Sequence, residues 1–219
     1  MARTTRTDIE MKRSFGVGGV AVLAALVLGG SGCSSKNVEA QPRARTTGDV
    51  SQYYPLAVGN RWTYRVNGRD DKPVSVEILK EEDGYFHDSQ GGQLAVDAYG
   101  LRDPKRYLLR APVEAGHSWT NVVSVSSTER YRILEAGVRC ESPAGTFDNC
   151  VQVEGRNRID EKATLINTQT FAPGVGMVRM QVDVETKDQR VPQTWLELTS
   201  WQVRPQGGAG PAREATPAG

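Results

Sequence analysis

The chain has 219 residues, with 27 Lys and Arg against 26 Asp and Glu, and a formal net charge of +1. This balance gives no reason to expect nucleic-acid binding, which relies on an excess of positive charge. Both ends of the chain are unsuited to a globular core, so we expect one domain of about 150 residues.

Residues 1–32 have the order of charges and apolar residues that is typical of a signal peptide. Lys12 and Arg13 precede an almost wholly apolar run over 17–28, and four small residues follow it. The run is shorter than the roughly 20 residues that a transmembrane helix needs, so the pattern favours a cleaved signal peptide over a permanent anchor. Met1 and Met11 are both suitable starts. Removing residues 1–32 changes the net charge from +1 to −1.

Cys33 directly follows these small residues. The segment 28–33, Leu-Gly-Gly-Ser-Gly-Cys, resembles the lipobox of bacterial lipoproteins, although its Leu lies two residues further from the cysteine than usual. The resemblance implies a Cys33 that carries diacylglycerol and an acyl chain such as palmitate. Ser34 is not the aspartate that retains such proteins in the inner membrane of enteric bacteria, so the resemblance favours the outer membrane, facing the periplasm or the cell surface. Simple secretion with a free Cys33 thiol is the alternative.

Two segments of low complexity border the expected domain. Residues 33–50 carry the lipidation site and then a polar stretch that predicts a flexible tether. Residues 204–219 consist mostly of Pro, Gly and Ala, which predicts a disordered tail. The domain is therefore expected over residues 51–203.

Hydrophobic residues in this domain recur with a period of two. Residues 178–185 alternate without interruption, with Val178, Met180, Val182 and Val184 on one face, which predicts a half-buried strand. Shorter patterns occur at 74–79, 122–126, 131–134, 151–153 and 195–201, between clusters of turn residues. No segment after the signal peptide resembles an amphipathic helix. We therefore predict a mainly β fold with a single antiparallel sheet, as a curved sheet, a sandwich or a partly closed barrel.

One short pattern occurs twice. Residues 55–63 and 112–120 share a Pro, an aliphatic residue, a Gly, a Trp and a Thr at matching positions, and each copy predicts a turn that leads into a strand. The repeat indicates either two similar halves of the sheet or one turn used twice.

Cys140 and Cys150 enclose a stretch that contains Pro143 and Gly145. In an exported protein such a pair predicts a structural disulfide. Closing so short a loop stabilises the fold by about 2 to 3 kcal/mol. A redox-active pair is the alternative, but the spacing differs from Cys-x-x-Cys.

Residues 53–64, Tyr-Tyr-Pro-Leu-Ala-Val-Gly-Asn-Arg-Trp-Thr-Tyr, and residues 171–178, Phe-Ala-Pro-Gly-Val-Gly-Met-Val, resemble two motifs of uncharacterised bacterial exported proteins. In that group the motifs bracket a β-rich domain, and Phe171 stands where a Tyr is usual. The resemblance implies an antiparallel sheet domain but brings no activity and no site residue with it.

Few residues suggest chemistry. His87 and His117 are the only histidines, and neither has the spacing of a zinc ligand. His87-Asp88-Ser89 lie too close along an extended stretch to form a catalytic triad, and the acidic runs lack the pattern of a calcium loop. We predict no catalytic residue, metal ligand or cofactor.

These observations favour a non-enzymatic role in the cell envelope, with the membrane contacted through the lipid. A protein partner would require an exposed apolar patch, and an apolar ligand would require an enclosed apolar cavity. The alternative is an envelope hydrolase whose site is assembled from scattered Ser, Asp, Glu and His residues.

Overall fold

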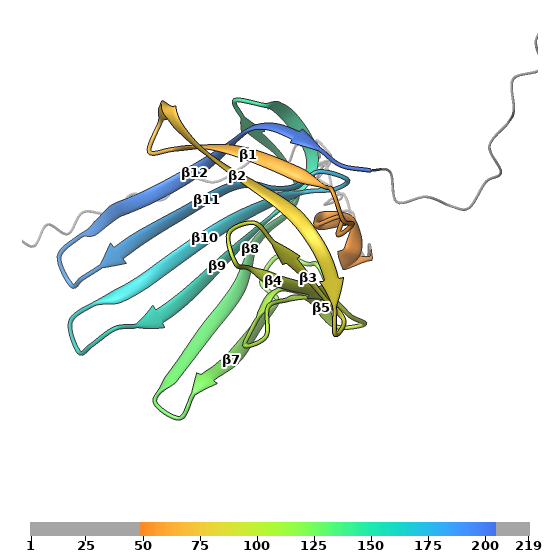
Figure 1. The fold of residues 1–219 in the computed structure, drawn as a ribbon. Helices are drawn as coiled ribbons and strands as arrows, with labels where there is room; N and C mark the ends of the chain where they lie inside the picture. Colours follow the sequence, from red (N-terminus) through yellow and green to blue (C-terminus); the bar gives the residue numbers. More distant parts are fainter. Residues whose placement is uncertain (1–48, 205–219) are drawn as a thin grey trace, which may run out of the picture. The chain divides into compact units, whose positions relative to one another are not determined.

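The computed structural model describes residues 49–204 (Figure 1). They form one antiparallel sheet of 12 strands that curves until it is nearly closed into a barrel. This confirms the mainly β fold and, among the predicted shapes, the partly closed barrel. In this part of the chain no helix is long and apolar enough to cross a membrane. The signal peptide, Cys33 and the tail after Arg204 lie outside the described residues, so those predictions stay predictions.

The sheet consists of two meanders of six strands. The first half contains β1 (Arg61–Val66), β2 (Arg69–Glu82), β3 (Tyr85–Asp88), β4 (Gln93–Val96), β5 (Gly100–Arg102) and β6 (Tyr107–Arg110). The second contains β7 (Ser118–Ser124), β8 (Ser127–Ser142), β9 (Gly145–Arg158), β10 (Thr164–Ala172), β11 (Gly176–Glu185) and β12 (Arg190–Gln202). Each strand pairs with the next in sequence, and β1 pairs with β12 to join the halves. A 3-10 helix, η1 (Val50–Tyr53), precedes β1.

The turns lie at two ends of the strands because consecutive strands are antiparallel. The open end comprises the turns after β1, β7, β9 and β11, at residues 67–68, 125–126, 159–163 and 186–189. The closed end comprises η1, the turns after β8 and β10, and the end of β12. The described chain therefore begins and ends at the closed end. Val50, at the border of the expected tether, is buried there.

The two segments of the family resemblance meet at the closed end. Trp62 Nε1 donates a hydrogen bond to the carbonyl oxygen of Val175 at 2.6 Å, and the Tyr64 hydroxyl donates to that of Met177 at 2.9 Å. Both aromatic side chains are fully buried. Gly176 lies under Trp62 so closely that a Cβ there would be 2.8 Å from Trp62 Nε1. These residues therefore hold the first strand against the turn after β10.

The repeated turn has the same geometry in both copies. Gly59, with a φ of +88°, donates its amide to the Ile78 carbonyl at 2.8 Å. Gly116, with a φ of +93°, donates to the Ile133 carbonyl at the same distance. Each copy opens one six-stranded half, and each of the two isoleucines is fully buried. The repeat thus marks two halves that begin in the same way.

Cys140 and Cys150 form a disulfide within the β8–β9 hairpin, with 6.0 Å between their Cα atoms. The tip of this hairpin reaches β12, where the Ala144 amide donates to the Leu198 carbonyl at 2.9 Å. The disulfide therefore lies in a hairpin that folds over the closed end.

Candidate binding surfaces

The inner face of the sheet becomes progressively less covered toward the open end. On β11 the predicted apolar face is fully buried at Val178, whereas Met180, Val182 and Val184 are half-buried. Leu165 on β10, opposite Val184, and Leu196 on β12, opposite Met180, are also half-buried. The barrel thus has a complete core at the closed end and a half-covered apolar inner face near the open end.

Two carboxamides on β10 lie on this inner face. Gln169 is opposite Met180 and Asn167 is opposite Val182. Asn167 Oδ1 and Gln169 Oε1 are buried and have no hydrogen-bond partner within residues 49–204. Buried carbonyl oxygens normally accept a hydrogen bond, so this part of the face offers acceptors beside apolar side chains.

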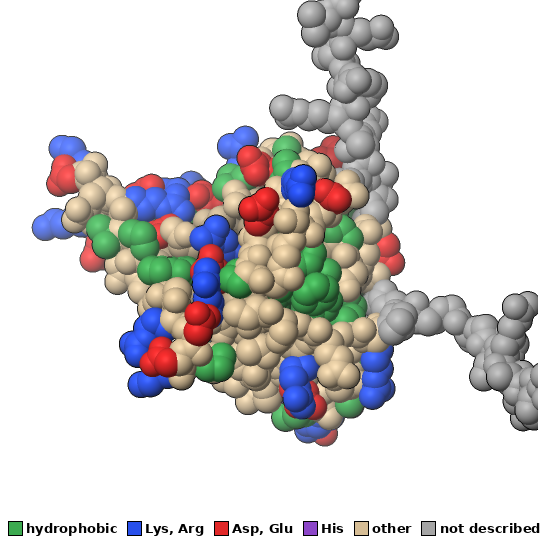
Figure 2. All heavy atoms as spheres, turned by 90° about the horizontal axis from the view of Figure 1, so that it is seen from above, with side chains coloured by type: hydrophobic (Ala, Val, Ile, Leu, Met, Phe, Trp, Pro, Cys, Tyr) green, Lys and Arg blue, Asp and Glu red, His purple; other side chains and the backbone are tan. Residues whose placement is uncertain are grey.

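The hairpin tips at the open end expose further apolar side chains. Val125 in the turn after β7 is fully exposed, Val122 on β7 is 71% exposed and Ile159 after β9 is 56% exposed. Val191 at the start of β12 is also exposed. Lys, Arg, Asp and Glu side chains are interspersed with hydrophobic ones on the surface of the domain (Figure 2). The open end therefore carries a few exposed apolar side chains among polar and charged turn residues of both signs.

The outer face of β9 to β12 carries a network of ion pairs. Asp183 is fully buried, although the alternation places it on the polar face of β11, because Arg190 binds its carboxylate with Nε at 2.7 Å and Nη2 at 2.6 Å. Arg190 also pairs with Glu154, and Arg156 pairs with Glu154 and Glu185. Removing one member would leave a buried charge without its partner, so this network is structural.

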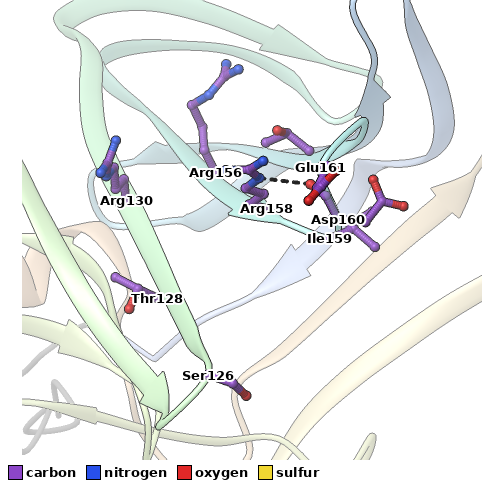
Figure 3. A pocket seen from close by; sticks show the side chains of 9 residues that line it. Ser126, Thr128, Arg130, Arg156, Arg158, Ile159, Asp160 and Glu161 are labelled. Atoms are coloured by element: carbon purple, nitrogen blue, oxygen red, sulfur yellow. Dashed lines mark hydrogen bonds between the residues drawn. The ribbon is translucent and has the colours of Figure 1, made fainter.

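A groove of about 770 Å³ lies beside this network on the outer face (Figure 3). Arg130 extends into it from β8 and Arg156 from β9, and the two residues are directly opposite in the sheet. Arg158 donates to the backbone carbonyl of Asp160 at 2.9 Å. Because Asp160 and Glu161 line the other side, the groove combines both signs of charge and favours neither.

The two edges of the sheet, β6 and β7, meet without a ladder of backbone hydrogen bonds. Instead, the Asn121 carboxamide accepts from the Tyr107 amide at 3.0 Å and donates to the Tyr107 carbonyl at 3.1 Å. Trp119 Nε1 donates to the same carbonyl at 2.9 Å. The side chain of Asn121 thus takes the place of a neighbouring strand and closes the seam between the two edges.

Asp97 organises the β5–β6 side of this seam. Its carboxylate accepts from the Tyr99 amide at 2.8 Å, from Arg102 Nε at 2.8 Å and from the Tyr107 hydroxyl at 2.9 Å. Burial raises the pKa of Asp97, but these hydrogen bonds outweigh it and leave the pKa below the ordinary value. Burial, together with the hydrogen bond to Asp97, raises the pKa of Tyr107, so the hydroxyl stays a donor.

A buried carboxylate lies behind the seam. Glu129 accepts a hydrogen bond from the Tyr131 hydroxyl at 3.1 Å, and Arg106 Nη1 lies 3.5 Å from Glu129 Oε1. Burial and the neighbouring Glu129 raise the pKa of Tyr131. Arg106 also pairs with Asp103 at 3.1 Å. This cluster ties the turn after β5 to β8. This cluster was not predictable from the sequence, because Arg106 and Glu129 are 23 positions apart and meet only in the folded domain.

Neither histidine lines the groove described above. His87 Nε2 is 4.0 Å from Glu82 Oε2, while Asp88 accepts from the amides of Gln90 and Gly92. The ring of His117 is 5.7 Å from that of Trp119, and its Nε2 is buried without a hydrogen-bond partner among the described residues. Within residues 49–204 no group of three or more His, Cys, Asp or Glu side chains is placed to hold a metal.

No family model matches the chain, and no curated protein matches it either. Among solved structures, it is similar to a protein from Parabacteroides distasonis that is provisionally described as a lipoprotein. The two chains are 12% identical with a TM-score of 0.36, over 71% of this chain and 100% of the other. A likeness this distant says nothing about activity, and the motif resemblance stays a prediction.

Proposed function

We propose that the protein is a lipid-anchored component of the cell envelope that binds a partner protein at its open end, without catalysis. The observation that carries the proposal is the apolar surface left uncovered there, which includes Val122, Val125 and Ile159 at the rim and Val182 and Val184 inside. Val122, Val125 and Ile159 lie on the adjacent hairpins β7–β8 and β9–β10, and exposed apolar side chains that gather within a polar border are typical of protein interaction sites.

A protein partner fits this surface better than a small apolar ligand does. The exposed side chains belong to three separate hairpins, so one small molecule would not cover them. The groove of about 770 Å³ on the outer face is lined by charged side chains, whereas small-molecule pockets are mostly apolar.

The proposed lipid anchor is supported by Cys33 and by the lipobox-like segment before it. The described chain begins at the closed end of the domain, whereas the proposed docking surface is at its open end. Outer-membrane location is part of the same proposal and rests on Ser34 after the cysteine.

The anchor is tested by the intact mass of the full-length protein extracted from bacterial membranes, beside a Cys33→Ala variant. We expect a mass for residues 33–219 plus diacylglycerol and an acyl chain, absent from the variant. An unlipidated mass for the unaltered protein would refute the anchor.

Docking is tested by site-specific photocrosslinking of the full-length protein in membranes of its native host. A crosslinking residue at Val125 or Ile159 should give one discrete adduct with a second protein. The control position is Asp148, which is exposed on β9 away from the open end. Adducts of equal yield at Asp148, or none at the rim, would refute docking at the open end.

A further inference from the structure

A groove of about 410 Å³ lies along the seam between β6 and β7, and we propose that it binds an acidic, extended peptide segment. This groove shares Val122 with the rim of the open end, but its cations lie on and between β5 and β6, and the proposal does not depend on the proposed function. Its two walls differ in chemical character, because one carries cations and the other is uncharged.

One wall carries four cations. Arg102 is neutralised by Asp97 at 2.8 Å and Arg106 by Asp103 at 3.1 Å. The other two, Lys105 and Arg110, form no ion pair with any residue in 49–204. The groove therefore holds two positive charges without a carboxylate of their own, which favours an anionic ligand.

Arg110 is held in place by aromatic rings. Its guanidinium carbon lies 5.5 Å from the ring centroid of Tyr107 and 6.0 Å from that of Tyr99. A guanidinium stacked on aromatic faces keeps its N–H donors directed outward, where they can bind a carboxylate with two parallel hydrogen bonds. Tyr99 is 61% exposed, so the stack lies at the surface.

The opposite wall is uncharged. Thr120 and Val122 of β7 line it, and Val122 is 71% exposed. A bare phosphate would use the cations but leave Val122 and the Tyr99 ring in water. An extended peptide with acidic and apolar side chains matches both walls, because its side chains alternate in direction.

The groove is fixed before any ligand binds. Asn121 and Trp119 join β7 to Tyr107, and Asp97 holds both Tyr107 and Arg102. A ligand therefore does not have to order these side chains, and this lowers the entropic cost of binding.

The test uses the mature chain in detergent and fluorescence anisotropy with a labelled ten-residue peptide that contains five Glu among Ser and Val. The matched peptide has Gln in place of each Glu. We expect binding of the Glu peptide to be at least about tenfold tighter and to weaken with salt. Arg110→Gln should weaken binding of the Glu peptide about tenfold. Lys105→Gln, which removes a charge that has no ion pair in the described chain, should weaken binding by a smaller factor.

The control is Arg139→Gln, which removes one charge from an exposed position on β8. Unchanged affinity in this variant supports a localised site. Equal loss in Arg139→Gln, or equal affinity for the Glu and Gln peptides, would overturn the proposal. Inorganic phosphate that displaces the peptide at the peptide's own concentration would also overturn it, because the site would then be a simple anion site.

Discussion

Gly176 is a residue at which the backbone and a buried side chain come too close for any Cβ. Its φ is +116°, and an added Cβ would be 2.8 Å from Trp62 Nε1. The same approach positions the Val175 carbonyl for the Trp62 hydrogen bond. This explains in physical terms why the turn after β10 contains a glycine at this position.

Gly176→Ala should therefore lower the free energy of unfolding by more than about 2 kcal/mol, because Trp62 must move and a left-handed φ is strained for alanine. The measurement is urea unfolding of the mature protein. Gly174→Ala is the matched control, since Gly174 has a φ of +71° but no atom within 4 Å of the added Cβ. Its expected loss is about 1 kcal/mol, and equal losses in the two variants would contradict the clash.

Asp97 gives a pH-dependent contribution to stability. Its pKa is lower in the folded protein than in an unfolded chain. Its contribution is therefore complete above about pH 4, the usual value for unfolded aspartate, and is lost as the pH falls through the lower folded pKa. Asp97→Asn should be less stable than the unaltered protein at pH 7, and the difference should shrink below pH 4. Urea midpoints at both pH values measure it; a difference that grows in acid would contradict this sign.

The roles of these residues were only partly predictable from the sequence. The glycines and Trp62 stood out because they form motifs. Asp97 and Glu129 did not, because they lie outside the predicted strand patterns. Asp183 did not, because an acidic residue in a strand pattern predicts a solvated face; the pairing of β11 with β12 brings its partner Arg190 beside it.

At the scale of elements, the seam depends on one side chain. Asn121→Leu keeps the approximate size but removes both hydrogen bonds to Tyr107, so the Tyr107 amide loses its partner and the Tyr107 carbonyl keeps only the bond from Trp119. We expect a loss of about 2 kcal/mol and much faster hydrogen exchange at the Tyr107 amide. Thr120→Val, a change at an exposed neighbour on β7, should leave that amide protected. Unchanged exchange at Tyr107 in Asn121→Leu would show that the seam closes by other contacts.

The β8–β9 hairpin provides a second test at this scale. A Cys140→Ala/Cys150→Ala variant should lose about 2 to 3 kcal/mol of unfolding free energy, because the closed loop restricts the unfolded chain. Reduction of the unaltered protein should produce a similar loss in urea unfolding. Full stability in the double variant would show that the hairpin is held by its contacts with β12 alone.

Elements were predictable where the alternation was long or contained large apolar residues. The pattern at 178–185 lies within β11, and the patterns at 74–79 and 195–201 lie within longer strands. The expected strand at 122–126 is partly wrong, because the chain turns at 125–126. β10 was missed because Asn167 and Gln169 occupy inner positions, and β3 to β6 were missed because three or four residues are too few to show a period.

At the scale of the whole domain, two similar halves meet in two different ways. The halves are joined by backbone pairing between β1 and β12, but only by side chains between β6 and β7. Local alternation cannot distinguish these junctions, because closure depends on how the whole sheet curves. For the same reason the sequence left open the choice among curved sheet, sandwich and barrel.

The closed end makes the segment before β1 part of the domain. Val50, Tyr53 and Tyr54 are buried in the core, and the Gly174 amide donates to the Gln52 carbonyl at 2.7 Å. Each large apolar side chain contributes roughly 1.5 to 3 kcal/mol on burial, so losing this segment removes a large part of the stability of a domain this size.

A chain of residues 49–204 should therefore unfold in one cooperative transition with nearly the free energy of the mature protein, because all twelve strands and their core lie within it. A chain of residues 57–204 should lose cooperative unfolding, since the closed end would expose Trp62 and its neighbours to water. Near-UV circular dichroism during urea titration distinguishes the two outcomes. If the shorter chain unfolds like the longer one, the buried segment before β1 is an accessory to a barrel that is stable without it.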